Sequence, residues 1–145
     1  MFANAASFNS DIPAWDVSSI TVMKGMLAFS GASSFSSDIS KWNVSSVMDM
    51  SAMFWEAKAF DGDISEWEVS RVTNIVGMVV DAESFQSDIS NWDVSRVTDM
   101  HQIFVRSNFE ADVSEWDVSK VVSMMNMFTD AALFNGDIFD WDVSR

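Results

Sequence analysis

The sequence contains no cysteine and no tyrosine, a single histidine, His101, and a single proline, Pro13. Without cysteine the fold has no disulfide bonds and no thiolate metal site. Zinc and nucleophilic sites usually need His or Cys side chains, or a nucleophile beside a base. The carboxylates that are present recur in every repeat described below, whereas a catalytic constellation normally occurs once in a chain. We therefore predict a protein that is not an enzyme and that carries no cofactor.

Basic residues are also scarce, with 8 Lys and Arg against 22 Asp and Glu, which gives a formal net charge of −14 at pH 7. A field of this sign repels nucleic acid and anionic membrane surfaces. No 18-residue apolar run is present, so we expect no membrane span. The segment also shows no signal peptide at its start. The predicted partner is another protein, and the charge favours one with a basic surface.

A tetrapeptide of Trp, an acidic or amide residue, Val and Ser returns six times along the chain. Its tryptophans lie 27, 25, 25, 24 and 25 residues apart, at Trp15, Trp42, Trp67, Trp92, Trp116 and Trp141. A fixed period in the twenties is typical of proteins whose repeats stack on one another. We expect a single array over residues 1–145, belonging to a longer chain, with uncapped ends that contact neighbours in a larger assembly.

Two periodicities divide each repeat. Trp67 and Val69 alternate with Glu68, as residues of a half-buried strand do. Farther on, apolar residues fall three or four positions apart, which is the spacing of a helical face. That run is Val72, Ile75, Met78, Val79, Ala82 and Phe85. Ser70 precedes the run and stands where a helix N-cap would. Each repeat therefore predicts a short strand, a turn, and a short helix or 3₁₀ turn.

Residues 88–100, Asp-Ile-Ser-Asn-Trp-Asp-Val-Ser-Arg-Val-Thr-Asp-Met, resemble the BspA-type leucine-rich repeats. They are most similar to the 25-residue Trp-rich variety known as a mycoplasma domain of unknown function, and the resemblance covers the whole chain. It implies adhesion or protein binding in large surface-exposed proteins, favours a cell-surface or extracellular location, and brings no catalytic site.

The expected fold class is thus an α/β repeat. It is a right-handed leucine-rich-repeat-like solenoid with parallel β-strands on one face and short helices or 3₁₀ turns on the other. The strands are expected near residues 12–18, 39–45, 64–70, 89–95, 113–119 and 138–144.

The tryptophans admit two interpretations, a sugar-binding stripe and a buried ladder. One Trp per repeat, alternating with polar neighbours, favours the ladder, in which each ring buries ~150–250 Å². Trp55 breaks the pattern, because it follows Met53 and Phe54 where other repeats carry small or polar residues. We take Trp55 as a candidate contact on the outer face, with local packing as the alternative.

An aspartate precedes the Ile or Val of each repeat. These residues are Asp11, Asp38, Asp63, Asp88, Asp112 and Asp137. A carboxylate needed in every repeat usually accepts backbone N–H bonds in a turn. A ladder of bound calcium is the alternative, because stacked carboxylates supply the oxygen ligands that calcium prefers. The glycine-rich pattern of calcium-binding β-helices is absent.

Polar residues that are expected to point outward from the predicted strands form the candidate partner-binding rows. One row is Asp16, Asn43, Glu68, Asp93, Asp117 and Asp142. A basic row follows three residues later, at Arg71, Arg96 and Lys120. Ion pairs between repeats, each worth less than ~1 kcal/mol, are one interpretation. The other is a striped surface that selects a partner. We predict a non-catalytic protein-binding or scaffolding module that acts through its acidic strand face or its ends. The alternative is a structural or adhesive cell-surface spacer array, either with or without stabilisation by bound calcium.

Overall fold

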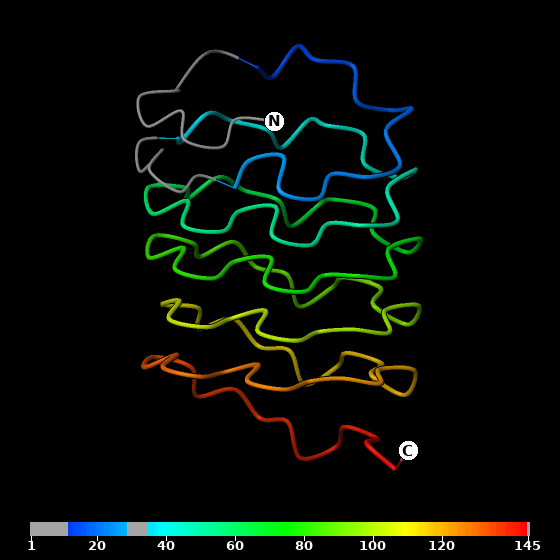
Figure 1. Ribbon diagram of the computed structural model, residues 1–145, viewed down its shortest axis with the longest axis vertical. Coiled ribbons are helices and arrows are strands. Elements are labelled where there is room, and N and C mark those ends of the chain that lie inside the picture. Colours follow the sequence, from blue (N-terminus) through cyan, green and yellow to red (C-terminus); the bar gives the residue numbers. More distant parts are fainter. Residues whose placement is uncertain (1–11, 29–34, 145) are drawn as a thin grey trace.

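The structure is a computed structural model that describes residues 12–28 and 35–144. The chain winds into coils that lie one below another, from the blue N-terminal end to the red C-terminal end (Figure 1). Backbone hydrogen bonds join residues one repeat apart. The Met50 N–H donates to the Asn74 carbonyl at 2.9 Å, and the Phe104 N–H donates to the Met127 carbonyl at 3.0 Å. The period of the tryptophans therefore corresponds to one coil of the stack.

The described residues contain no α-helix, no 3₁₀-helix and no β-strand. The predicted α/β class, a leucine-rich-repeat-like solenoid with parallel strands and short helices, is therefore wrong. The segments expected as strands consist of turns and irregular chain, and they are 12–18, 39–45, 64–70, 89–95, 113–119 and 138–144. Parallel pairing occurs instead at one isolated residue per coil, where a helix was expected. That column is Val22, Asp49, Asn74, Asp99 and Ser123.

The coils are built from consecutive β-turns. The Trp67 N–H donates to the Ile64 carbonyl at 3.2 Å, and the Met78 N–H donates to the Ile75 carbonyl at 3.1 Å. A β-turn brings its first and fourth residues together, and in both turns these end residues are buried. Apolar residues three positions apart are thus the two ends of a turn. The spacing that predicted a helical face comes from this series of turns.

Several turns contain a residue in the left-handed region, with φ between 50° and 59°. One column of such residues is Gly25, Ala52, Gly77, Gln102 and Asn126, and a second is Glu56, Asp81, Arg106 and Asp130. In the turn from Met50 to Met53, Ala52 occupies the third position, as in a type II turn. A side chain in this region costs ~1–2 kcal/mol. The Ala52 N–H offsets part of that cost by donating to the Val76 carbonyl of the next coil at 2.7 Å.

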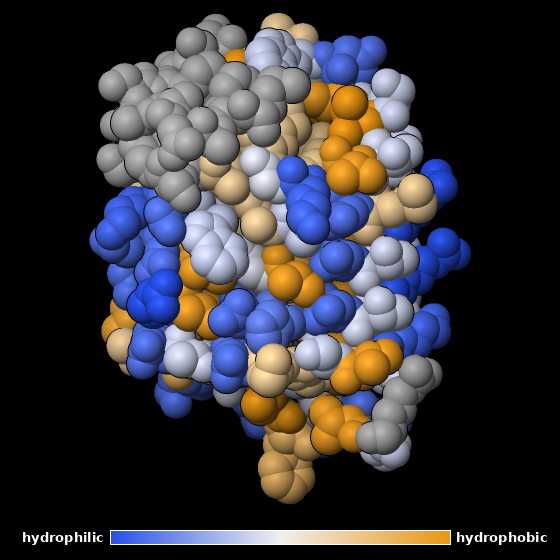
Figure 2. Space-filling model, in the orientation of Figure 1, coloured by the Kyte–Doolittle hydropathy of each residue, from blue (hydrophilic) through white to orange (hydrophobic). Residues whose placement is uncertain are grey.

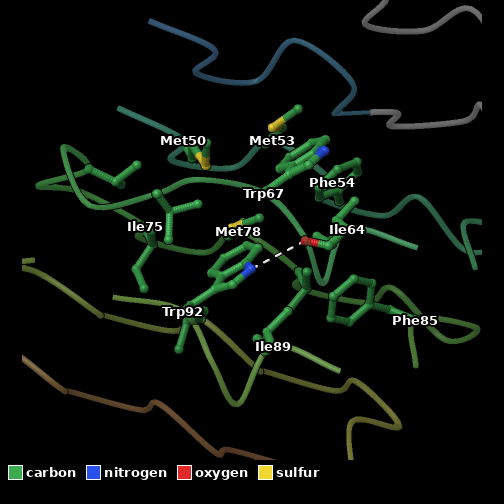
Figure 3. Close-up of a cluster of buried hydrophobic side chains, with 14 of the residues drawn as sticks. Met50, Met53, Phe54, Ile64, Trp67, Ile75, Met78, Phe85, Ile89 and Trp92 are labelled. Atoms are coloured by element: carbon green, nitrogen blue, oxygen red, sulfur yellow. Dashed lines mark hydrogen bonds between the residues drawn. The ribbon is translucent and has the colours of Figure 1, made fainter. Parts of the chain in front are cut away.

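The interior consists of columns of like side chains. The four inner repeat tryptophans are only 3–4% exposed, which confirms the predicted buried ladder, and they are Trp42, Trp67, Trp92 and Trp116. Each indole N–H donates to a carbonyl of the preceding coil, as Trp92 does to Ile64 at 3.2 Å (Figure 3). The indole therefore contributes apolar area and also joins two coils.

Phenylalanines form a second column beside the tryptophans. Its rings stack at centroid distances of 5.8 to 6.4 Å, in the order Phe35, Phe60, Phe85, Phe109 and Phe134. Phe54 stacks on Phe60 at 4.3 Å and lies 6.3 Å from Trp67, so the two columns touch. Met50, Met53 and Met78 fill the remaining space around them. The core is continuous along the stack, and no coil encloses its own aromatic side chains.

Replacing Gln102 by Gly is expected to raise the free energy of unfolding by about 0.5–1 kcal/mol, because glycine removes the cost of the left-handed conformation. The control is Asn91→Gly in an exposed turn position that lacks a positive φ, where added chain flexibility should lower stability. Urea unfolding of both variants measures the difference. A loss of stability in Gln102→Gly equal to that in Asn91→Gly would contradict the assignment of strain.

Replacing Trp92 by Phe keeps an aromatic ring but removes the N–H that reaches the buried Ile64 carbonyl. Loss of one partner of a buried hydrogen bond costs ~1–3 kcal/mol. Trp141→Phe is the matched control, because that indole makes the same bond, to Val113 at 3.0 Å, from a half-buried position in the last coil. Chemical denaturation should show the larger loss for Trp92→Phe; equal losses would mean that the buried bond adds little.

Candidate functional site: the acidic face

In each coil, the segment from Asp-Ile-Ser to Trp-Asp-Val-Ser directs its polar residues outward. Ile64 and Trp67 are buried, whereas Asp63, Glu66 and Glu68 between and beside them are exposed. Because the coils are in register, these residues form columns along the stack. We call the columns together the acidic face; its members are Asp38, Asp63, Asp88, Asp112, Asp137, Glu66, Glu115, Asp140, Asp16, Asn43, Glu68, Asp93, Asp117 and Asp142. Hydrophilic side chains cover much of the side of the stack seen in Figure 2.

The first aspartate of each segment accepts a hydrogen bond from the backbone N–H two residues later. Asp88 Oδ1 accepts from the Ser90 N–H at 3.0 Å, and Asp112 Oδ1 accepts from the Ser114 N–H at 2.9 Å. The same bond forms at Asp38, Asp63 and Asp137. The predicted backbone role of this aspartate is thus confirmed in the described coils, while Asp11 lies outside the described residues.

The predicted partner-binding row makes the same kind of bond. Asp93 Oδ1 accepts from the Ser95 N–H at 3.0 Å, and Glu68 does so through Oε1 from the Ser70 N–H at 3.0 Å. The other members with this bond are Asp16, Asn43, Asp117 and Asp142. Ser70 was predicted to cap a helix. Its N–H instead donates to Glu68, two positions earlier, because no helix follows.

These hydrogen bonds lower the pKa of seven aspartates below the usual value of 3.8. In Asp63 and Asp88 the main cause is the backbone N–H of the serine two residues on, and in Asp93 it is the serine hydroxyl. The remaining four are Asp16, Asp38, Asp112 and Asp117. A donor that faces the ionised form stabilises it. The carboxylates therefore stay charged to lower pH, even though Asp63 opposes the ionisation of Asp88.

The basic row lies beside these columns. Arg71, Arg96 and Lys120 are exposed, and no ion pair within the described residues involves any of them. Arg96 is nevertheless close enough to help lower the pKa of Asp93. The ion pairs that form among the described residues lie elsewhere. They join Lys58 to Glu83 and Arg106 to Asp81, each across one coil step.

The candidate outer contact, Trp55, packs locally. Its side chain is half-buried, and its indole N–H donates to Glu56 Oε1 at 3.0 Å. The ring lies against Gly77 of the next coil, where an added Cβ would be 3.0 Å from Trp55 Cζ3. Gly77 therefore provides both the left-handed conformation and the space for the ring. None of these contacts of Trp55 involves a residue of the acidic face, and Trp55 is not next to that face in the sequence.

Sequence reasoning missed a third column of side-chain-to-backbone bonds. Asp49, Asn74 and Asp99 occupy the variable position of Val-Thr-x-Met, and each Oδ1 accepts from the N–H two residues later at 2.8 to 3.0 Å. The same residues make the parallel pairings between coils. The signal in the sequence was that all three positions hold Asp or Asn, whose side chains bond to the backbone two residues on. It was missed because this segment was interpreted as a helix.

Within residues 12–28 and 35–144, no group of three or more His, Asp or Glu side chains is arranged to hold a metal ion. The same residues contain no helix long and apolar enough to cross a membrane. His101 is half-buried, and its Nδ1 atom is buried without a hydrogen-bond partner in the described part of the chain.

Comparison with known proteins returns one family. A family model described as "Mycoplasma protein of unknown function, DUF285" matches residues 1–92 and again residues 77–145. No curated protein matches the chain, and no solved structure matches it.

The lowered aspartate pKa values predict a fall in stability in acid. A group whose pKa is depressed in the folded state contributes stability that is present above its unfolded value, near 3.8, and is lost as the pH falls through the folded value. The double variant Asp88→Asn, Asp112→Asn removes two such groups. The free energy of unfolding, measured with urea from about pH 6 to about pH 2.5, should therefore fall less steeply below pH 4 than in the parent.

The control for this experiment is Glu110→Gln with Glu115→Gln. Neither carboxylate accepts a hydrogen bond from a backbone N–H in the described residues. This pair should retain the parent's slope. An unchanged slope in the Asp88 and Asp112 variant would exclude the serine N–H bonds as the cause.

Proposed function

The chain belongs to the family described as Mycoplasma protein of unknown function, DUF285, and from this premise we propose that it is a non-catalytic protein-binding module. Its acidic face receives the basic surface of another protein. The observation that carries the proposal is that carboxylates recur in every coil, exposed and in register, and that in two of the columns the scaffold holds each acidic side chain through one oxygen. Such an array is complementary to a protein that presents Lys or Arg at a similar repeat distance.

In the aspartates held by a serine N–H, the second carboxylate oxygen is left for a partner. Oδ1 of Asp88, Asp93 and Asp117 is held by a serine N–H, and Oδ2 accepts no hydrogen bond from the described residues. A side chain already fixed by the fold loses little conformational freedom on binding. Charge-assisted hydrogen bonds to Oδ2 are therefore available at a low entropic cost.

The unpaired basic row supports selectivity. Arg71, Arg96 and Lys120 run along the edge of the acidic columns, so a uniformly basic surface would meet repulsion there. A partner that carries a basic strip and an adjacent acidic one would fit both rows. Like-charge contacts at the edge of an interface are a common means of rejecting other partners.

The resemblance of residues 88–100 to BspA-type repeats adds support at the level of sequence. It connects the repeat to proteins used in adhesion and protein binding. This relationship is part of the proposal, and it does not extend to the helices and strands that the resemblance led us to expect.

The test neutralises charge without removing the turn bonds. Asp93→Asn with Asp117→Asn keeps an oxygen acceptor at both positions, as Asn43 does in the same row. Binding of a lysine-rich peptide, used as the probe and measured by calorimetry, should weaken about five- to tenfold, with a smaller dependence on salt.

The matched control is Asp49→Asn with Asp99→Asn. It removes the same charge and also keeps its turn bonds, as Asn74 does in that column, but these residues lie outside the acidic face. Affinity should change much less in this pair. Equal losses in both pairs would show that binding follows net charge alone, and the proposed face would be wrong.

A further inference from the structure

The second coil contains a tripeptide that no other coil has. Five of the six Trp-x-Val-Ser segments carry Asp or Glu after the tryptophan, whereas the second carries Asn43, so residues 43–45 read Asn-Val-Ser. Asn-x-Ser or Asn-x-Thr, with x other than Pro, is the sequence at which an oligosaccharide is attached to an asparagine amide. None of the seven other asparagines of the chain has Ser or Thr two residues later.

The structure presents this asparagine to solvent. Asn43 is exposed, whereas the residues on either side of it, Trp42 and Val44, are buried. Asn43 belongs to a row of the acidic face, in which its neighbours Asp16 and Glu68, one coil before and one coil after, are also exposed. A bulky hydrophilic chain attached to Asn43 would therefore extend into solvent and would displace no core side chain.

Hydrogen bonds determine which end of the amide is available. Asn43 Oδ1 accepts from the Ser45 N–H at 3.1 Å and from the Ser45 hydroxyl at 2.7 Å. Because a backbone N–H needs an acceptor, the oxygen of the amide and not its nitrogen occupies this position. Nδ2 donates no hydrogen bond within the described residues. The nitrogen that receives a sugar in this kind of modification is therefore available.

We propose that Asn43 is the acceptor site for one N-linked oligosaccharide, which is supplied by a lipid-linked oligosaccharide diphosphate. In the transfer, a bond forms between Nδ2 of Asn43 and C1 of the first sugar, and the bond between C1 and the diphosphate oxygen breaks. The electron pair of the broken bond leaves with the lipid diphosphate. One proton of the amide passes to a base of the transferase, and no oxidant or reductant is needed.

The fold is compatible with the product because the transfer leaves Oδ1 unchanged. The modified amide keeps its carbonyl oxygen, so both bonds from Ser45 persist. In the same row, Glu68 and Asp93 make the equivalent backbone bond through a carboxylate, which has no nitrogen to receive a sugar. The row therefore offers one acceptor. This inference does not depend on the function proposed for the acidic face.

Secretion of the full chain from eukaryotic cells, behind a cleavable leader, tests the inference. The mass of the secreted protein is measured before and after treatment with peptide N-glycanase, and the parent should lose the mass of one oligosaccharide. Asn43→Asp should lose none; it introduces the residue that four other coils carry at this position, so the turn bond is preserved. Ser45→Ala, which keeps the asparagine but removes the hydroxyl, should also lose none.

The matched control is Asn91→Asp. Asn91 is exposed as well, but Trp92 and Asp93 follow it, so this variant should carry the same oligosaccharide as the parent. A parent without a removable oligosaccharide, or an Asn43→Asp variant that still carries one, would overturn the inference.

A further variant moves the tripeptide to the fourth coil. Asp93→Asn creates it in the same turn, in which Oδ1 of residue 93 accepts from the Ser95 N–H at 3.0 Å. Combined with Asn43→Asp, it should restore one oligosaccharide. Failure to restore it would contradict the role given to the turn and to its exposure, because both are shared by the two positions.

The decisive measurement uses the chain isolated from the cells that produce it. Mass spectrometry of the peptide that contains Asn43 should show an attached oligosaccharide, and peptide N-glycanase should release it and leave Asp at this position. An unmodified Asn43 in that material would overturn the proposal, whatever the outcome of secretion from other cells.

Discussion

A chain that turns every few residues cannot bond its backbone groups within a helix or a strand, and this constraint governs the whole structure. Buried N–H and C=O groups must nevertheless find partners. Here they do so in three ways: across a turn, to the next coil, and to a side-chain oxygen two residues earlier. The recurrence of Asp or Asn in three columns, with Glu68 at one position, follows from the third way. The acidic and amide residues that recur in each repeat thus stand at positions where a backbone N–H needs an acceptor.

The same side chains that satisfy the backbone also form the acidic face, but the fold does not require their charge. Asn43 makes the bond that Asp93 makes in the same row, at 3.1 Å against 3.0 Å. Asn74 likewise replaces the aspartate of its column with no change in the pattern of pairing. An amide is therefore sufficient for the turn. The negative charge at the other positions is an additional property, and stacked like charges oppose folding. This separation between what the fold needs and what the surface presents supports a role in recognition.

The sequence was sufficient to predict the repeat, the buried tryptophans and the backbone role of the aspartates, because each depends on one residue type in every repeat. It was not sufficient for the local conformation. Apolar residues three apart fit both a helical face and a series of β-turns, and the run from Val72 to Phe85 satisfies both. The distinguishing signals were present but weak. Gly25, Gly77 and Asn126 stand in one column and mark a left-handed corner, yet Ala52 and Gln102 occupy that column in other repeats. Only the register between coils shows why non-glycine residues tolerate it.

Hydrogen bonds between coils also give the stack a direction. Alternate N–H groups such as those of Met50 and Ala52 donate toward the C-terminal end, while indole N–H groups such as that of Trp92 donate toward the N-terminal end. The two directions along the stack are therefore chemically different. Because the indole reaches back by one coil, the tryptophan that fills the interior also bonds its own coil to the one before it.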